Sequence, residues 1–428
     1  MTAREAVLKA LYSMDKSGAY TNAALKEALS HRDFSAADRG LVTELIYGIV
    51  SNRLAIDYII SQFSNLKIKK MSLWVLNILR MGVYQIYYMD KIPQSAACNE
   101  AVVLAKKYSH GAGSGFVNGV LRAAARGKDG FEFPITNDAV RDLSLEFSYP
   151  EWMTKRLVDE YGEERCKELF LETRRPHSPS IRVNTLNCRA KELCKILEAE
   201  NVSCSHIEGL ENALIVSGKL NIENSEAYRK GLYSLQNISS QKAVEILDPK
   251  ENEFVIDMCA APGGKSCAIA EKMNNKGKVV AFDIHKHKLE LIKKSASRLG
   301  IDIIEVIEAD SSVQKEEFFE KADRVLADVP CSGLGVIHKK PDIKWAKTEA
   351  ELEEICEVQK KILETAAVYV KPGGVLLYST CTILPEENRL RIDDFLKTHT
   401  EYEKVYEEQI LTSSLGESGF YICKMMKG

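Results

Sequence analysis

Strand-like and helix-like stretches alternate regularly from about Gln236 to the end of the chain, and this alternation constrains the fold more than any other feature. The strand-like runs are short and aliphatic, and amphipathic helical patterns such as 286–299 and 349–370 lie between them. The predicted strands are Phe254–Cys259, Lys278–Asp283, Ile303–Ile307, Arg324–Asp328 and Val375–Thr380, with further runs at Tyr402–Tyr406 and Gly419–Met425. This pattern predicts an α/β fold with a mostly parallel, doubly wound sheet.

The first predicted strand runs into a tight turn, V-I-D-M-C-A-A-P-G-G-K, between Val255 and Lys265. Its glycines allow backbone N–H groups to approach a ligand closely, and Pro262 suits the entry of a helix. Nucleotide-binding folds of many kinds share such a turn, so the turn alone does not identify the ligand. A dinucleotide site would prefer G-x-G-x-x-G, from which this turn departs, and a dinucleotide oxidoreductase is therefore a weak alternative.

Three acids end successive predicted strands: Asp257, Asp283 and Asp310. Ligands of doubly wound sheets bind at the carboxyl ends of the strands. Asp283 follows the glycines at a distance suited to an acid that binds a ribose, and Asp310 would come close to an adenine edge. One acid at a strand end is often a helix cap, but three in register favour a nucleoside ligand.

Two cysteines fall at the same predicted edge, Cys331 in D-V-P-C-S-G and Cys381 in S-T-C-T. The other nine of the 11 cysteines are interpreted as small buried hydrophobes. The sequence has no C-x-x-C pair and no His/Cys cluster at zinc spacing, so we expect neither a metal site nor a disulfide framework. Two cysteines beside an acid, Asp328, are harder to explain as packing, yet spacing alone favours a catalytic and a structural interpretation about equally.

The first third of the chain shows helical spacing of apolar residues, with a strongly apolar helix near Trp74–Tyr87 at its predicted centre. Gly127 to Pro134 is rich in turn residues and is typical of a linker. Short helices and strands follow, including the β-branched run I-R-V-N-T-L at Ile181–Leu186. We therefore predict three domains, which are a helical bundle at 1–130, a small α+β unit at 138–235 and the α/β domain at 236–428.

Charge is distributed unevenly along the 428 residues. Residues 1–140 contain 17 Lys and Arg against 12 Asp and Glu, a net charge of +5, which leaves −8 for the remainder of a chain whose total is −3. A basic first third is compatible with nucleic-acid binding, although ordinary fluctuation explains it equally well. No apolar run reaches the roughly 18 residues of a transmembrane helix, and the start resembles no signal peptide. We expect a cytoplasmic protein without membrane contact.

The motifs D-M-C-A-A-P-G-G-K, D-V-P-C-S-G and S-T-C-T, in this order from Gln236 to the end, resemble the Sun-type family of RNA 5-methylcytosine methyltransferases. R-E-A-V-L-K-A-L-Y, D-R-G-L-V-T-E-L-I-Y-G, I-P-Q-S-A-A-C-N-E-A-V and F-V-N-G-V-L-R resemble the NusB-type RNA-binding domain. The I-R-V-N-T-L unit resembles the RNA-facing N1 region of the methyltransferase family. These resemblances imply a Rossmann-like methyltransferase domain that uses S-adenosylmethionine (SAM), preceded by an all-α NusB-like bundle and the small α+β unit.

The resemblance also implies roles for individual residues. Cys381 would be the nucleophile, Cys331 would assist release, Asp328 would face the target base and Lys265 would lie close to the active site. Residue types alone do not rank the two cysteines, because DNA cytosine methyltransferases use the cysteine of their P-C motif as nucleophile. The implied cofactor contacts are Cys259, Ala260, Ala261, Pro262, Gly263, Gly264, Lys265, Asp283, Asp310 and Asp328.

The implied reaction is methylation of carbon 5 of a specific cytosine in 16S rRNA, unassembled or partly assembled, by a monomer. Two alternatives stay open: the same chemistry on tRNA or another rRNA site, and a non-catalytic NusB-like RNA-binding or antitermination protein. In G-V-I-H-K-K-P-D-I-K-W, His338 stands where relatives often have arginine. Lys339, Lys340 and Lys344 keep this segment basic, and we expect Trp345 to be available for stacking on a base.

Overall fold

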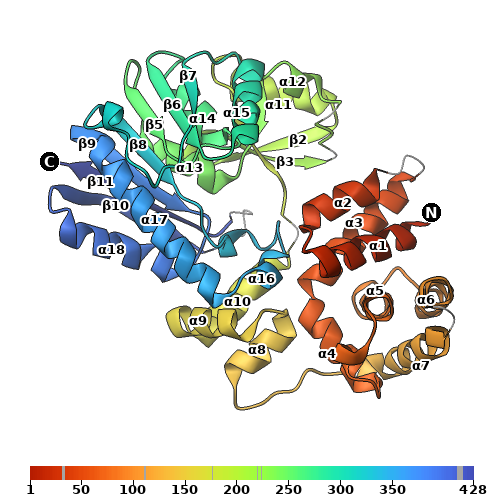
Figure 1. Cartoon of the computed structure of the whole chain (residues 1–428). Helices are drawn as coiled ribbons and strands as arrows, with labels where there is room; N and C mark the ends of the chain where they lie inside the picture. The colour runs from red at the N-terminus through yellow and green to blue at the C-terminus, as the bar shows by residue number, and fades with distance from the viewer. Residues whose placement is uncertain (31–33, 110–111, 176, 219, 223, 412–417) are drawn as a thin grey trace. The chain divides into compact units, whose positions relative to one another are not determined.

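A computed structural model describes residues 1–30, 34–109, 112–175, 177–218, 220–222, 224–411 and 418–428. The chain packs as two compact units, the first formed by residues 1–173 with 337–347 and the second by residues 174–336 with 348–428. Figure 1 shows the helical elements of the first unit and the sheets of the second. Packing units need not coincide with domains, so the predicted boundaries near 130 and 235 stay predictions.

The first unit is helical, and α5 is the central helix of the bundle formed by α1 to α7. This helix is apolar on nearly all sides, and an unbroken buried run from Val75 to Ile86 places it at the centre of the bundle, as its sequence predicts. The unit comprises α1 (Ala3–Ser17), α2 (Thr21–Leu29), α3 (Ala36–Ser51), α4 (Arg53–Phe63), α5 (Leu73–Tyr88), α6 (Gln94–Tyr108), α7 (Ala112–Gly127), α8 (Ala139–Phe147), α9 (Glu151–Tyr161), α10 (Glu163–Thr173), α16 (Ile343–Ala346) and the 3₁₀ turns η1 (Ile68–Lys70) and η2 (Lys128–Gly130).

Residues 337–347 belong to the first unit although they lie far along the chain. The Lys344 ammonium donates to the carbonyl oxygen of Ser51 at 2.7 Å, and its side chain is almost completely buried. The indole N–H of Trp345 donates to the carbonyl oxygen of Val50 at 2.8 Å. The buried ammonium of Lys344 is therefore bound to the end of α3, whereas Trp345 is only half-buried and its stacking on a base stays a prediction.

The second unit contains a seven-stranded sheet in the order β10-β11-β9-β8-β5-β6-β7. The five strands from β9 to the β7 edge are parallel, and β11 runs antiparallel to both β9 and β10, which confirms the mostly parallel sheet that the sequence predicts. The strands are β5 (Phe254–Asp257), β6 (Lys278–Asp283), β7 (Ile304–Glu308), β8 (Ala322–Asp328), β9 (Val370–Thr380), β10 (Tyr402–Ile410) and β11 (Phe420–Lys427).

Helices cover both faces of this sheet because successive side chains of each central strand point to opposite sides. Val255 of β5 packs in a core with three helices, and its neighbour Ile256 packs in a separate core with two others. The first face carries α13 (Ile238–Leu247), α14 (Gly264–Lys272) and α15 (Lys286–Leu299), and the second carries α17 (Glu349–Tyr369) and α18 (Arg389–Thr398). Short 3₁₀ turns lie at η3 (Glu316–Phe318), η4 (Leu334–Val336) and η5 (Pro385–Glu387).

A four-stranded antiparallel sheet in the order β2-β3-β1-β4 completes the second unit. Its elements are β1 (Ser180–Val183), α11 (Ala190–Ala199), β2 (Val202–Ile207), β3 (Leu210–Gly218), α12 (Glu226–Arg229) and β4 (Tyr233–Leu235). Ile181 and Val183 are buried against α11, as the β-branched pattern predicts. Of the helices in the described part of the chain, none is long and apolar enough to cross a membrane.

Candidate active site

The carboxyl ends of the parallel strands gather polar and nucleophilic side chains at one edge of the large sheet. Asp257, Asp283 and Asp328 are the last residues of β5, β6 and β8, and Asp310 lies two residues beyond β7. Cys381 directly follows β9. Since β5, β6, β7, β8 and β9 are parallel, these residues lie at the same edge, which is where a doubly wound sheet binds its ligands.

The turn between β5 and α14 has a conformation that requires glycine at one position. Gly263 has a φ of +102°, and a Cβ at this residue would lie 3.1 Å from the Cα of Ile292. Ala260 donates its N–H to the carbonyl oxygen of Phe282 at 2.8 Å, which ties the turn to β6. Pro262, which follows a cis peptide bond, lies directly before the N-cap residue Gly263, and Gly264 is the first residue of α14.

Asp257 is buried at the base of this turn. Its Oδ2 accepts a hydrogen bond from the Ser266 hydroxyl at 2.6 Å, whereas its Oδ1 has no partner among the described residues. Burial raises the pKa of Asp257 to about 7, and the charge of Asp328 adds to the rise. An orphaned carboxylate oxygen beside a ligand turn is an acceptor that a bound ammonium group can use.

Cys259 shows how closely the acids surround the turn. Burial raises the pKa of its thiol well above the usual value. Carboxylate charges raise it further, and they come from Asp257, Asp328, Asp283 and Asp310. SAM fits these groups. Gly263 allows a ligand to approach the backbone closely, and the strand-end carboxylates can accept hydrogen bonds from ribose hydroxyls. Asp257 can accept a hydrogen bond from the amino group of SAM.

Lys265 and Asp328 form an ion pair at the centre of the edge. The Lys265 Nζ lies 2.6 Å from the Asp328 Oδ2, and the Asp328 Oδ1 accepts from the Ser379 hydroxyl at 2.8 Å. Burial disfavours the charge of Lys265, but Asp328 and Asp257 outweigh that effect and raise its pKa. A permanent cation therefore lies beside the strand ends, and Cys381 interacts with it electrostatically.

The two cysteines face each other. The sulfur atoms of Cys331 and Cys381 are 3.1 Å apart, and the backbone N–H of Cys381 donates to the Cys331 sulfur at 3.3 Å. Contact with Cys381 and burial raise the pKa of the Cys331 thiol well above its usual value. Cys331 is therefore a neutral thiol next to Cys381, which interacts electrostatically with the Lys265 cation. Among the described residues, no group of three or more His, Cys, Asp or Glu could hold a metal.

Comparisons with known proteins place this geometry in a family. The model described as 16S rRNA methyltransferase RsmB/F matches residues 244–421, the NusB family model matches 1–126, and the ferredoxin-like domain of RsmF/B-like methyltransferases matches 149–223. A Bacillus subtilis (strain 168) protein named "Probable ribosomal RNA small subunit methyltransferase B" is 39% identical, over 99% of this chain and 98% of that relative. The chain belongs to the ribosomal RNA small subunit methyltransferase B family.

Solved structures resemble this member of the methyltransferase B family over much of its length. The crystal structure of the protein PH0851 is 29% identical with a TM-score of 0.81, over 99% of this chain and 98% of that one. A methyltransferase homolog from Pyrococcus horikoshii is also 29% identical, with a TM-score of 0.60, over 68% of this chain and 100% of its own. The resemblances in the N-terminal and C-terminal motifs are thus confirmed as family membership.

Sequence reasoning missed a buried acid that links the two cysteine loops of this family member. Glu387 accepts from the Ser332 N–H at 2.8 Å and from the Gln359 amide at 2.9 Å, and it also accepts from the Ser332 hydroxyl. That hydroxyl lies 2.8 Å from the hydroxyl oxygen of Thr382. Ser332 follows Cys331 and Thr382 follows Cys381, so the acid ties both loops. Its signal, P-E-E-N after S-T-C-T, looks like an ordinary charged helix start.

Proposed function

We propose that this chain transfers a methyl group from SAM to carbon 5 of a specific cytosine in 16S rRNA, through a covalent bond between Cys381 and carbon 6. The pair of thiols 3.1 Å apart, beside the ion pair of Lys265 and Asp328, is the observation that carries the proposal. The names of the relatives support small-subunit rRNA as the substrate class.

The chemistry of cytosine explains why a nucleophile is needed. Carbon 5 of the free base is too weak a nucleophile to attack a methyl sulfonium. When a thiolate bonds to carbon 6, the electrons of the C5–C6 double bond become available at carbon 5. SAM, when bound, supplies the electrophilic methyl group. The protein must therefore supply a thiolate, an acid that faces the base, and a means of breaking the carbon–sulfur bond afterwards.

Cys381 supplies the thiolate in this proposal. The charge of Lys265 favours its ionised form, as cations near reactive cysteines generally do. Asp328 faces the N3/N4 edge of the base and supports a proton on N3, which withdraws electrons while the sulfur adds to carbon 6. The ion pair with Lys265 and the hydrogen bond from Ser379 fix the orientation of the Asp328 carboxylate for this role.

Release reverses the addition. Carbon 5 carries both the new methyl group and its original proton; the proton leaves to water, the double bond re-forms and the Cys381 sulfur departs as a thiolate. Cys331 assists this step, because its neutral thiol lies 3.1 Å from the departing sulfur and can donate a hydrogen bond to it.

A cytosine stacked in folded RNA is not accessible to this edge, and unstacking a base costs a few kcal/mol. We therefore propose unassembled or partly assembled 16S rRNA as the substrate, bound by a monomer of the chain. The Gly263–Lys265 turn with Asp283 and Asp310 would hold SAM, and Cys259 would line its pocket without a chemical role.

Cysteine variants test the proposed mechanism. Cys381→Ala should abolish transfer of labelled methyl groups from SAM to 16S rRNA while the affinity for SAM, measured by calorimetry, stays at the wild-type value. Cys331→Ala should accumulate a covalent protein–RNA adduct, visible as a slowly migrating band on a denaturing gel. Cys194→Ala, which changes a half-buried cysteine of α11, is the matched control and should behave as the wild type.

Full methyl transfer by Cys381→Ala would contradict the proposal. An adduct that forms with Cys381→Ala but not with Cys331→Ala would mean that the roles of the two cysteines are exchanged. If the product of the wild-type reaction contains no 5-methylcytosine, the proposed methylation at carbon 5 is wrong.

A further inference from the structure

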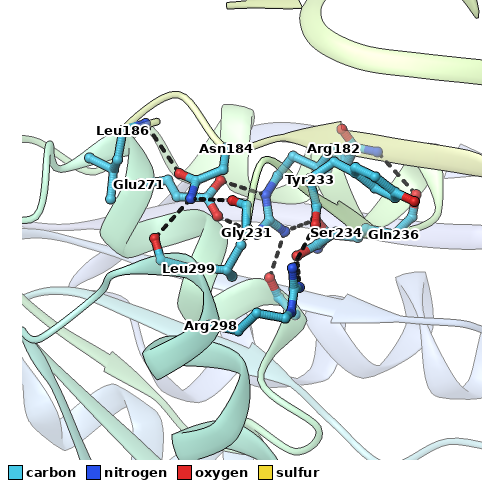
Figure 2. Close-up of polar contacts among 12 residues, drawn as sticks. Arg182, Asn184, Leu186, Gly231, Tyr233, Ser234, Gln236, Glu271, Arg298 and Leu299 are labelled. Atoms are coloured by element: carbon cyan, nitrogen blue, oxygen red, sulfur yellow. Dashed lines mark hydrogen bonds and ion pairs between the residues drawn. The ribbon is translucent and has the colours of Figure 1, made fainter. Parts of the chain in front are cut away.

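Arg182 lies in the middle of β1, yet its charged side chain is buried. Its Nε and Nη2 donate to the two carboxylate oxygens of Glu271, at 2.8 and 2.7 Å, in a bidentate ion pair. Its Nη1 donates to the carbonyl oxygen of Gly264 at 2.8 Å and to the side-chain oxygen of Gln236. Figure 2 shows the side chain of Arg182 pointing from the small sheet toward Glu271.

These contacts hold α14 at two places. Gly264 is the first residue of the helix, and Glu271 lies seven residues later, two turns along the same face. Gln236 lies beside this start: its side-chain oxygen accepts from Arg182, and its buried amide nitrogen would be 3.7 Å from a Cβ placed on Gly264. The start of α14, where the Gly263–Lys265 turn enters the helix, is thus fixed from the small sheet.

Asn184 extends the contact to α15. Its amide donates to the carbonyl oxygens of Gly231 and Leu299, at 2.8 Å each. In return, Arg298 of α15 donates to the carbonyl oxygen of Tyr233 at 3.0 Å. Figure 2 shows these groups beside the ion pair of Arg182. The side chains of Arg182 and Asn184 therefore face α14 and the end of α15, and the expectation that the small unit as a whole faces RNA stays a prediction.

A buried ion pair is weak evidence for stability, because desolvation of two charges offsets much of their attraction. What Arg182 adds is geometry: a rigid guanidinium presents several donors in fixed directions, so it sets the position of the Gly264 carbonyl relative to Glu271. Lys265, the next residue, reaches Asp328 from this same start of the helix. A shift of the turn would therefore move both the Gly263–Gly264 backbone and the Lys265 side chain that pairs with Asp328.

We propose that Arg182 is a positioning residue for the cofactor turn. Together with Gln236 and Glu271 it fixes the start of α14, so that the Gly263–Lys265 backbone and the Lys265 side chain are pre-arranged for SAM. This inference rests on the proposed use of SAM and deepens it, since it assigns to the small sheet a part in cofactor binding.

The chain contains a matched control. Arg324 of β8 makes a bidentate ion pair and a carbonyl contact of the same kind, with two bonds to the carboxylate of Glu253 at 2.6 and 3.0 Å and one to the carbonyl oxygen of Leu247 at 2.7 Å. It lies near the start of β8, whereas the site lies at the end of that strand. Removing this pair perturbs the same unit without touching the turn.

The experiment compares two double variants, Arg182→Met with Glu271→Leu and Arg324→Met with Glu253→Leu, which remove both charges of each pair. We expect the affinity for SAM, measured by calorimetry, to fall about tenfold in the first, the equivalent of one charge-assisted hydrogen bond. In the second double variant the affinity for SAM should stay within about twofold of the wild type, because the Arg324–Glu253 pair lies at the opposite end of β8 from the SAM turn. Hydrogen exchange of the 259–266 amides should accelerate only in the first, and KM for SAM should rise more than kcat falls.

Arg182→Lys keeps the charge beside Glu271 but cannot also reach the Gly264 carbonyl, so it should fold normally and still bind SAM more weakly. It decides the question if the double variant does not fold. Wild-type affinity for SAM in Arg182→Lys, or an equal loss in both double variants, would overturn the inference. A wild-type chain that does not bind SAM in the same titration would instead overturn the proposed function, and the inference with it.

Discussion

Asp257 is a carboxyl group whose protonation depends on the fold. Burial raises its pKa from 3.8 to about 7. A carboxyl with a raised pKa in the folded state binds its proton more tightly there than in the unfolded chain. Its contribution to stability is therefore present below pH 4 and is lost as the pH rises through about 7. The full effect is on the order of 4 kcal/mol.

Asp257→Asn removes this titration. Between pH 5 and pH 8 we expect the wild type to lose about 2.5 kcal/mol of stability that the variant does not lose, so the free energy of unfolding of the variant minus that of the wild type rises by this amount. Urea unfolding at both pH values, without ligand, measures it. The unpaired amide nitrogen that replaces Oδ1 costs the same at each pH and cancels in the comparison. A difference that is independent of pH would contradict the raised pKa.

At the scale of single residues, the sequence predicts at which strand end a residue lies better than it predicts which side chain the residue contacts. Cys381, Asp283 and Asp328 could be placed at one edge because each stands at the end of a predicted strand. The bond between Lys265 and Asp328 joins residues 63 apart in sequence, and no local pattern specifies it. The burial of Arg182 could not be predicted either, because a charged residue inside a strand is expected to be exposed unless its buried partner is known.

At the scale of elements, η5 connects the two cysteine loops through Glu387. Glu387→Ala would leave the Ser332 N–H and the Gln359 amide without their buried acceptor. We expect the free energy of unfolding to fall by about 3 kcal/mol, and methyl transfer to slow because the two sulfurs are no longer held together. Urea unfolding and single-turnover kinetics measure the two effects.

Glu353→Ala, a change at an exposed position of α17, is the control for Glu387→Ala and should alter the free energy of unfolding by less than about 0.5 kcal/mol. If Glu387→Ala has an equally small effect on both stability and turnover, the acid does not tie the loops together.

The elements themselves were predicted well where periodicity is strong and less well at their ends. Strand β9 is longer than expected, since it begins at Val370 instead of Val375. The intervening K-P-G-G contains residues that usually break strands, and a register shift in the pairing with β8 accommodates them. Such an irregularity depends on the neighbouring strand, so the local sequence does not show it.

At the scale of the whole molecule, chain order and packing differ. Residues 337–347 lie between η4 and α17 in sequence but pack in the first unit, where Lys344 bonds to a residue 293 positions earlier. The segment is basic in sequence, yet the ammonium of Lys344 is buried, because a sequence shows charge but not what covers it. The order of the family motifs could be predicted from the sequence, but the packing of this segment could not.

The central claim concerns the product of the whole molecule, a methyl group on carbon 5 of one cytosine in 16S rRNA. Bisulfite sequencing of 16S rRNA tests it in cells that lack the gene and in the same cells complemented with wild type or Cys381→Ala. The account predicts that one 5-methylcytosine is lost on deletion, restored by the wild type and not restored by Cys381→Ala. An unchanged 16S rRNA pattern, with the loss in tRNA or in no RNA at all, would contradict it.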